Sequence, residues 1–453
     1  MAYTDIDDPT IYFNTKLYTG NGSTNAITGV GFAPDWTLLK DRNDTSGTRA
    51  YDTVRGAIKR IRTDLTDAEI DDSDGLTAFG NDGFTLGADG ATNASGTLYV
   101  SWNWSAGGAS PAITYTVKVV SDSGNKYRFD DFGTSAVTLD LQEGGTYTFD
   151  QSDSSNSGHP LRFYTASDKS GGEYTTGVTT TGTPGSSGAK TVITVAASAP
   201  TLYYQCSNHA GMGGQANTNS LFGSSNFSGS VQTKVSANTT AGFSIVSYSG
   251  TGTAGTVGHG LGSTPKLIIV KVRNFATNWL VQHANVASTK VLYLDANNAE
   301  TTDSVFNDTL PTSSVFSVKT ANGINASGKT YIAYCFSEIK GYSKFGSYTG
   351  NGNADGTYVH LGFRPAWIVV KPIDATQNWQ IHDTKRLGYN VTNKNLSFNN
   401  TASEAENDFM DILSNGFKIR RSDVLNVSGD EYIYWAFAES PFVNSKGVPT
   451  NAR

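Results

Sequence analysis

The chain has 453 residues, too many for one hydrophobic core, and at roughly 100–200 residues per domain it predicts three or four domains. Only 16% of the residues are charged whereas 11% are aromatic and 49 are glycine, which argues against disorder and favours strands and turns over amphipathic helices. The net charge of −7 disfavours sequence-independent nucleic-acid binding, and no apolar run approaches the roughly 20 residues of a membrane span. Two cysteines exclude a disulfide scaffold, and the first residues show no secretory signal.

A strand-and-turn pattern occurs three times along the chain. Each copy opens with an aromatic strand ending in a Gly-rich turn, continues with a proline-led apolar strand that ends in lysine, and closes with a Ser-Gly turn followed by a strand of alternating aromatic and smaller residues. The period-2 alternation predicts a closing strand with one buried face. The openings lie at 16–22, 245–252 and 345–352, the proline-led strands at 34–40, 265–271 and 365–371, and the closings at 93–104, 325–336 and 426–437.

The offsets between the copies predict the domain organisation. Copies two and three are adjacent, whereas about 130 residues of different character separate copies one and two. We therefore expect four parts: repeat unit 1 (1–108), an insert (109–223), repeat unit 2 preceded by a linker (224–340), and repeat unit 3 (341–453). The expected fold class is all-β, with every part a β-sandwich. Only 53–65 and 402–413 show apolar spacing that favours short helices.

Units 1 and 3 share a D-T-x-R tetrad, Asp52–Arg55 and Asp383–Arg386, which unit 2 lacks. The two pairs are either ligand contacts or Asp–Arg pairs that close a turn, and the second interpretation is favoured. The histidines of the repeats, His259 with His360 and His283 with His382, sit at related positions and are expected to pack rather than to bind a ligand. Cys335 lies within a predicted strand and is expected in the core.

The insert contains one cluster of residues whose types and spacing are typical of a metal site. Cys206, His209 and Met212 form the spacing C-x2-H-x2-M, and His159 lies 47 residues upstream, beyond a predicted strand. Thiolate and thioether favour Cu(I), imidazole suits both oxidation states, and two histidines with one cysteine and a weak methionine are a type 1 copper ligand set. The sequence predicts copper binding here. The alternatives are a vestigial or unfilled site, and a cysteine that is simply a small buried side chain.

On these residues, together with the G-x-x-Y-x-F strand before His159 and the Y-Y-x-C strand, the insert resembles the cupredoxins. The resemblance implies a Greek-key sandwich with His159, Cys206, His209 and Met212 as the four copper ligands. Pro160 departs from the pattern of that family, in which an asparagine often follows the first histidine, so the hydrogen bonds around the cysteine are expected to differ.

The repeat motifs resemble a domain of about 100 residues in virion proteins of marine tailed bacteriophages, notably cyanophages. The resemblance implies a virion structural protein, a tail or head fibre or appendage acting in assembly and host-surface binding, made in the host cytoplasm and not an enzyme. Its partners would be other virion proteins, further copies of itself in a trimer, and a host polysaccharide or receptor, with no nucleic acid and no membrane insertion. The alternatives are a capsid decoration protein, and a copper-binding redox protein whose active part is the insert.

Overall fold

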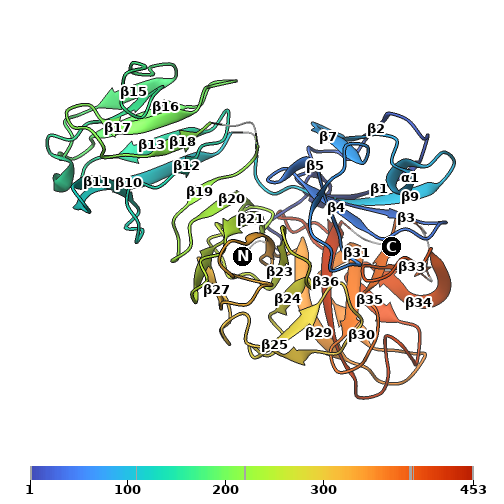
Figure 1. The fold of residues 1–453 in the computed structure, drawn as a ribbon. Helices are drawn as coiled ribbons and strands as arrows, with labels where there is room; N and C mark the ends of the chain where they lie inside the picture. The colour runs from blue at the N-terminus through green and yellow to red at the C-terminus, as the bar shows by residue number, and fades with distance from the viewer. Residues whose placement is uncertain (1–2, 109, 219–220, 387–389, 391, 451–453) are drawn as a thin grey trace.

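The computed structural model describes residues 3–108, 110–218, 221–386, 390 and 392–450. Strands make up 43% of it and helices 2%, so the predicted all-β, multidomain class is confirmed. Figure 1 shows two lobes, a smaller one built from the insert and a larger one built from the three repeat units. Within the described residues, no helix is both long and apolar enough to cross a membrane.

Each repeat unit builds the same sheet. The closing strand lies between the opening strand and the proline-led strand and pairs antiparallel with both, and two further strands extend the sheet beyond the proline-led strand. In this spatial order the strands are β1 (Phe13–Thr19), β9 (Leu98–Trp104), β3 (Trp36–Asp41), β4 (Arg49–Asp52) and β5 (Gly56–Arg62) in unit 1; β21 (Phe243–Ser249), β28 (Thr330–Phe336), β23 (Leu267–Val272), β24 (Leu280–His283) and β25 (Lys290–Tyr293) in unit 2; and β29 (Ser343–Thr349), β36 (Glu431–Pro441), β31 (Phe363–Pro372), β32 (Gln380–Asp383) and β33 (Thr392–Ser397) in unit 3.

Short strands complete each unit: some of them extend the main sheet at its edges, and others build a local apolar core on the outer face of that sheet. They are β2 (Asn25–Thr28), β6 (Ile70–Asp71), β7 (Leu76–Gly80) and β8 (Gly83–Leu86) in unit 1; β19 (Ser224–Asn226), β20 (Thr233–Asn238), β22 (Gly255–Gly258), β26 (Thr301–Thr302) and β27 (Val315–Val318) in unit 2; and β30 (Tyr358–His360), β34 (Ala405–Leu413) and β35 (Gly416–Ile419) in unit 3. The only helical turns of the described residues are η1 (Pro9–Ile11), α1 (Gly90–Asn93) and η2 (Ser154–Asn156).

The inner faces of the three sheets pack on one another and form one shared core that contains all seven tryptophans of the chain. Aromatic contacts join every pair of units. Trp36 stacks on Tyr334 of unit 2 with ring centroids 4.4 Å apart, Trp104 meets Trp367 of unit 3 at 5.4 Å, and the remaining boundary is closed by a pair at 6.1 Å, Phe336 with Trp435. The three units therefore form a closed ring around a common aromatic centre, instead of separate domains in a row.

The closing strands are consequently buried on both faces, and the prediction of one buried face is wrong. In β28, for example, Tyr334 and its alternate neighbours face the shared core, while Cys335 and its neighbours face the core of unit 2. Every residue from Tyr331 to Phe336 is buried. Sequence alternation here separates two cores, not a core and a solvent face.

The lysine that ends each proline-led strand ties its unit to the next one around the ring. The ammonium group of Lys40 donates to the Asn400 carbonyl of unit 3 at 3.1 Å, that of Lys271 to the Thr66 carbonyl of unit 1 at 2.8 Å, and that of Lys371 to the Asn297 carbonyl of unit 2 at 3.3 Å. Burial lowers the pKa of each of these lysines to about 8. The same lysine in the same motif thus makes the same cross-unit contact three times.

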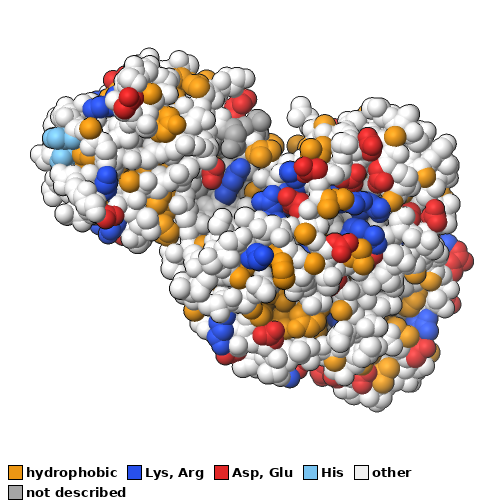
Figure 2. Space-filling view, in the orientation of Figure 1, with side chains coloured by type: hydrophobic (Ala, Val, Ile, Leu, Met, Phe, Trp, Pro, Cys, Tyr) orange, Lys and Arg blue, Asp and Glu red, His pale blue; other side chains and the backbone are white. Residues whose placement is uncertain are grey.

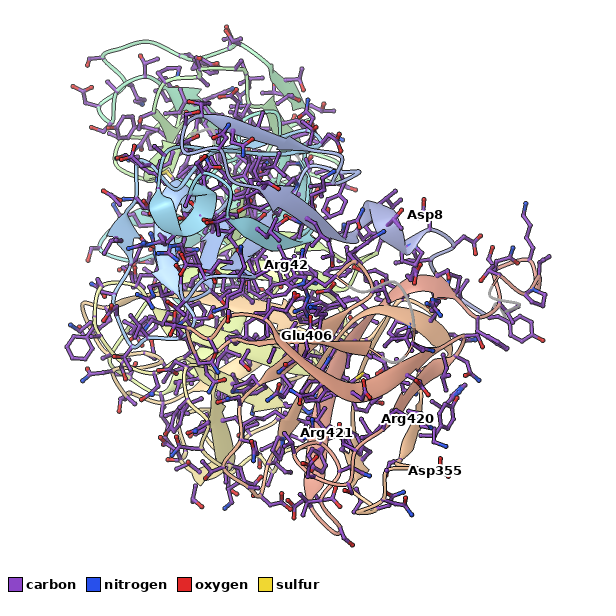
Figure 3. All side chains as sticks on the ribbon, turned by 90° about the vertical axis from the view of Figure 1, so that its right-hand side faces the viewer. Asp8, Arg42, Asp355, Glu406, Arg420 and Arg421 are labelled. Carbon is purple, nitrogen blue, oxygen red and sulfur yellow. The ribbon has the colours of Figure 1, made fainter. Side chains whose placement is uncertain are left out.

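Ion pairs reinforce two of the three boundaries. Figure 3 shows Arg42 where unit 1 meets unit 3, above the strand that carries Glu406. The Arg42 guanidinium pairs with Glu404 at 3.0 Å, and that of Arg273 in unit 2 pairs with Glu69 in unit 1 at 2.8 Å. At the third boundary Ile373 takes the place of the arginine, and the backbone hydrogen bond that accompanies each of the two ion pairs is kept, from the Glu300 N–H to the Ile373 carbonyl.

The repeated Gly-rich turns and the N-x-S-G-x-x-Y closings fit together in all three units. A buried asparagine accepts a hydrogen bond from the turn, and two tyrosines stack beside it at 4.9–5.1 Å. In unit 2, the side-chain oxygen of Asn325 accepts from the Thr251 N–H at 2.9 Å, and a Cβ on Gly250 would lie 2.1 Å from the Ala326 carbonyl oxygen. The asparagines are Asn93, Asn325 and Asn426; the tyrosine pairs are Tyr18 with Tyr99, Tyr248 with Tyr331, and Tyr348 with Tyr432. These motifs are therefore structural.

In each D-T-x-R tetrad the aspartate and the arginine form a buried ion pair that closes a turn, so the prediction of Asp–Arg pairs that close a turn is confirmed. Neither side chain of the Asp52–Arg55 pair or of the Asp383–Arg386 pair is exposed to solvent. Each aspartate also meets a neighbouring unit, because the Tyr334 hydroxyl donates to Asp52 at 2.7 Å and the Trp102 indole N–H donates to Asp383 at 3.1 Å.

Three other sequence expectations differ from the structure. Residues 53–65 and 402–413 form a turn with β5 and the strand β34 instead of helices, because pairing with neighbouring strands outweighs weak helix propensity. The expected linker before unit 2 contributes β19 and β20, which extend the sheet of that unit beyond β21. His283 and His382 are not equivalent: His283 pairs with Leu267, at the position that Asp383 takes opposite Trp367.

The insert is a sandwich of a five-stranded and a four-stranded sheet around its own core. Phe227, which follows β19, stacks on Phe129 at 5.8 Å and joins that core to unit 2. The five-stranded sheet has the order β11 (Asn125–Phe129), β10 (Ala112–Ser121), β13 (Thr146–Asp150), β16 (Lys190–Thr194) and β15 (Val178–Thr181); the four-stranded sheet has the order β12 (Leu139–Asp140), β18 (Gln215–Asn217), β17 (Leu202–Cys206) and β14 (Leu161–Tyr164).

The buried histidines of the repeat units predict a loss of stability in acid. Burial lowers the pKa of His283 to about 4, while its neutral ring accepts from the Asn285 N–H at 3.1 Å and contacts the Tyr434 carbonyl of unit 3 at 3.3 Å. An unfolded histidine takes up its proton near pH 6.5, so between about pH 6.5 and 4 the unfolded chain binds more protons and the free energy of unfolding falls as the pH falls.

Denaturant unfolding at pH 7 and pH 4.5, followed by tryptophan fluorescence, measures this loss. We expect His283→Gln to be less pH-sensitive than the wild type. His360→Gln is the control, because His360 is exposed. Burial raises the pKa of Asp35 to about 6 and acts in the opposite direction, but equally in all three proteins. An unchanged pH dependence in His283→Gln would contradict the assignment.

Candidate metal centre

Strand pairing in the insert brings the two halves of the cluster together. His159 lies in the turn between η2 and β14, two residues before Leu161, and Cys206 is the last residue of β17. Because β14 and β17 are antiparallel with Leu161 opposite Cys206, the turn carrying His159 meets the loop that starts at Cys206. The Ser207 N–H donates to the Pro160 carbonyl at 3.0 Å and continues the ladder into that loop.

The donor atoms of His159, Cys206 and His209 all lie within 4.8 Å of one another. The Cys206 Sγ is 3.5 Å from the Nδ1 of His209 and 3.9 Å from the Nδ1 of His159. Metal–ligand distances of about 2.3 Å to sulfur and about 2.0–2.1 Å to nitrogen, at tetrahedral to trigonal angles, separate such donors by roughly 3.5–3.8 Å. The separation from Cys206 to His209 lies within this range and that to His159 lies just beyond it, so the three side chains are close to the arrangement that a metal ion requires.

The fourth candidate, Met212, is buried in the core of the insert on the same loop. The loop returns tightly because its glycines leave no room for side chains: a Cβ on Gly213 would lie 1.6 Å from the Tyr204 carbonyl oxygen, and one on Gly214 would lie 2.6 Å from the Ala136 carbonyl oxygen. The Tyr127 N–H donates to the Met212 carbonyl at 2.9 Å and fixes the backbone of this residue.

Further polar side chains hold the two ligand-bearing segments. The ammonium group of Lys169 donates to the carbonyls of Cys206 and Ser207, at 3.2 Å each. The Asn208 amide donates to the Gly158 carbonyl at 2.9 Å and so links the cysteine loop to the histidine turn. The Gln151 amide donates to the His159 carbonyl, also at 2.9 Å. No sequence pattern marks these residues, because they lie apart from the candidate ligands along the chain or belong to no motif.

The cluster reaches solvent at the end of the smaller lobe. Cys206 is buried, His159 is half-buried and His209 is exposed. Figure 2 shows histidine side chains together at the end of this lobe that is farthest from the repeat units. Burial, followed by the neighbouring His209, lowers the pKa of His159 and so favours the neutral imidazole that a metal ion requires.

The other candidate residues do not join this cluster. Cys335 is fully buried in the core of unit 2, as predicted, and burial raises the pKa of its thiol. His259 is buried and packs on the neighbouring turn, accepting from the Leu261 N–H at 3.2 Å. His360 differs from the expectation, because it is exposed and contacts the Tyr358 hydroxyl at 3.2 Å.

Comparison with known protein families identifies one family that matches the chain over all three repeat units. Residues 8–138 and 215–441 match DUF7483, a domain of unknown function. The chain belongs to the DUF7483 family. The match leaves out residues 139–214, which contain all four predicted metal ligands, so the candidate centre lies outside the part of the chain that the family describes. No curated protein and no solved structure matches the chain.

Proposed function

We propose that this DUF7483 protein is a structural protein of a bacteriophage particle, without catalytic activity, and that its insert binds one copper ion. The observation that carries the copper assignment is the separation of the three donor atoms, 3.5 and 3.9 Å from the cysteine sulfur to the two histidine nitrogens. Bound copper would supply a redox-active centre and additional folding free energy for the insert.

The chemistry of the donor set favours copper over hard cations. A thiolate and two imidazoles suit copper and zinc, whereas magnesium and calcium prefer oxygen donors. The buried Met212 on the same loop adds a soft sulfur donor, which favours copper over zinc. His159, Cys206 and His209 would hold the ion, with Met212 as the weak fourth ligand.

Titration of the purified protein with Cu(II) and with Zn(II) tests the assignment. We expect one equivalent of copper to bind and to give an intense absorption in the red, which zinc does not give. Binding of zinc alone, or no binding of either ion, would overturn the copper assignment. If added reductant bleaches the band reversibly and copper leaves the melting temperature unchanged, the redox alternative is favoured over a structural role of the ion.

The assignment to a phage particle rests on the resemblance of the repeat motifs and is supported by how those motifs are used. The lysines, asparagines and tyrosines of the motifs make hydrogen bonds within or between units, and the Asp–Arg pairs of the tetrads are buried. The repeats therefore build a rigid body, which suits a fibre, an appendage or a capsid decoration protein. Mass spectrometry of purified particles should find this chain, and its absence there would end the proposal.

The three-unit ring changes the expectation of a trimer. Threefold packing of related sheets is achieved within one chain, so a homotrimer is not needed to bury their inner faces. The trimer remains a prediction, and native mass spectrometry of the purified protein tests it. A mass of 144 kDa, three times the 48.1 kDa of the chain, supports it, and a monomeric mass contradicts it.

A further inference from the structure

A polar cleft lies between the two lobes, where β12 of the insert faces the sheet of unit 2. Its volume is about 360 Å³, within the range of ~300–1,000 Å³ that is usual for small-ligand sites. Figure 2 shows Lys and Arg side chains together in the hollow between the lobes. The side chains that matter here are those of Asp140, Lys234, Ser247, Ser249, Arg273 and Thr330.

The wall contributed by unit 2 is the polar end of a sheet face that is otherwise apolar. On β21, Ile245 packs into the shared core, and Ser247 and Ser249 follow it at two-residue steps on the same face. The strand register places Lys234 of β20 opposite Ser247, and Thr330 of β28 opposite Ser249. Directly opposed residues of paired strands share a face, so four polar side chains gather where the apolar core ends.

These four side chains have hydrogen-bonding capacity to spare. The ammonium group of Lys234 is half-buried, and no described residue forms a hydrogen bond or an ion pair with it. The hydroxyl groups of Ser247, Ser249 and Thr330 also have no partner in the part of the chain that the structure describes. An ammonium group carries three donors, and partial burial strengthens its attraction for an anion. The cleft is therefore suited to a negatively charged acceptor.

The other charged groups of the cleft define the ligand further. The Arg273 guanidinium is neutralised by Glu69 of unit 1, to which its Nε and Nη2 donate at 2.9 and 2.8 Å. Asp140 accepts from the Asn217 amide at 3.0 Å through one oxygen, and no described residue donates to its other oxygen. Sulfate would satisfy only the lysine, because it brings no donor for Asp140. A molecule that carries both an anionic group and hydroxyl groups would satisfy both walls.

Units 1 and 3 lack this combination, although their sheets are built in the same way. Their opening strands, β1 and β29, are edge strands, so neither unit has a counterpart of β20 or of Lys234. The position of Thr330 is taken by Leu98 in unit 1 and by Glu431 in unit 3, where the Thr349 hydroxyl donates to that carboxylate at 2.6 Å. The cleft is thus a property of unit 2 and the insert, and does not follow from the repeated motifs.

We propose that this cleft binds a sugar that carries a carboxylate group: the carboxylate accepts hydrogen bonds from Lys234 and from the hydroxyls of Ser247 and Thr330, and the sugar hydroxyls donate to Asp140. The binding is non-covalent. It goes beyond the proposed function, because it requires neither copper nor membership of a phage particle.

Calorimetric titration of the full chain with sodium glucuronate, sodium galacturonate, glucose and sodium sulfate, at constant ionic strength, tests the proposal. We expect at least one uronate to bind with one equivalent per chain, and glucose to bind at least about tenfold more weakly. Lys234→Gln should weaken uronate binding by about tenfold or more, because it removes a hydrogen bond between charged groups. The matched control is Lys319→Gln, a lysine of unit 2 that follows β27 and does not line the cleft. Its affinity should equal that of the wild type.

A second variant covers a failure of Lys234→Gln to fold. Ser249 is exposed, so Ser249→Asp should leave β21 paired while its carboxylate repels the ligand, and uronate binding should be lost. The proposal is overturned if neither uronate binds to the wild type, if glucose binds as tightly, if sulfate alone binds, or if a folded Lys234→Gln or Ser249→Asp protein keeps wild-type affinity. None of these results affects the copper assignment, which the metal titration tests separately.

Discussion

Replacing Cys206 by serine is expected to abolish the red absorption and to weaken copper binding by more than 100-fold. In the proposed site the thiolate would give the bound copper its colour and a preference for Cu(I), and a serine hydroxyl is not deprotonated at neutral pH. The fold should persist, because the change removes one buried sulfur from the end of a strand. Copper titration monitored by absorption, with circular dichroism as the check on folding, measures the effect.

Cys335→Ser is the matched control for this substitution. Cys335 is the other buried cysteine of the chain, in the core of unit 2 and away from every histidine cluster that the described residues form. We expect its copper binding and colour to equal those of the wild type. A Cys206→Ser protein that keeps the red band, or a Cys335→Ser protein that loses it, would place the ion elsewhere.

Replacing Trp36 by alanine is expected to destabilise all three repeat units together. Trp36 is buried between units 1 and 2, with ring centroids 4.4 Å from Tyr334, 4.7 Å from Trp104 and 5.7 Å from Phe243. Truncation of a buried aromatic side chain costs about 3–5 kcal/mol, and here the cavity opens in a core that the three units share. Denaturant unfolding followed by tryptophan fluorescence should show one transition at a lower denaturant concentration.

The insert provides an internal reference for this experiment, because it contains no tryptophan and the absorption band proposed for its copper ion would report on it alone. We expect the insert of the Trp36→Ala protein to keep binding copper at denaturant concentrations that unfold its three repeat units. Phe275→Ala is the control, since Phe275 is 39% exposed, and its loss should change stability by no more than about 1 kcal/mol. Separate fluorescence transitions for the individual units would contradict a shared core.

The repeats were predictable from the sequence because the residues of each motif contact one another within one unit and therefore recur together. The asparagine, the glycine and the tyrosine pair of one turn must occur together, and the same hydrogen bonds recur in all three units. The strand positions followed from the same motifs. The ring was not predictable, because alternation within β28 marks two faces without saying that Tyr334 on one of them meets Trp36, almost 300 residues away in the chain.

The cluster of the candidate metal centre was predictable for a related reason. Cys206, His209 and Met212 lie on one loop, so their spacing shows in the sequence, and His159 is the single other histidine of the insert. The neighbouring Tyr127, Gln151 and Lys169 were not predictable, because only the folding of the chain brings them to the candidate ligands and their residue types are common in β-proteins. The two helical predictions failed where an apolar spacing was compatible with both a helix and a paired strand, as in β34.

Anomalous diffraction at the copper absorption edge, on crystals of the copper-loaded protein, tests the central claim most directly. We predict one strong peak per chain, within about 2.0–2.3 Å of the Cys206 sulfur and of the Nδ1 atoms of His159 and His209. A peak at another place, or none in protein that has been shown to be folded and exposed to copper, would contradict the account.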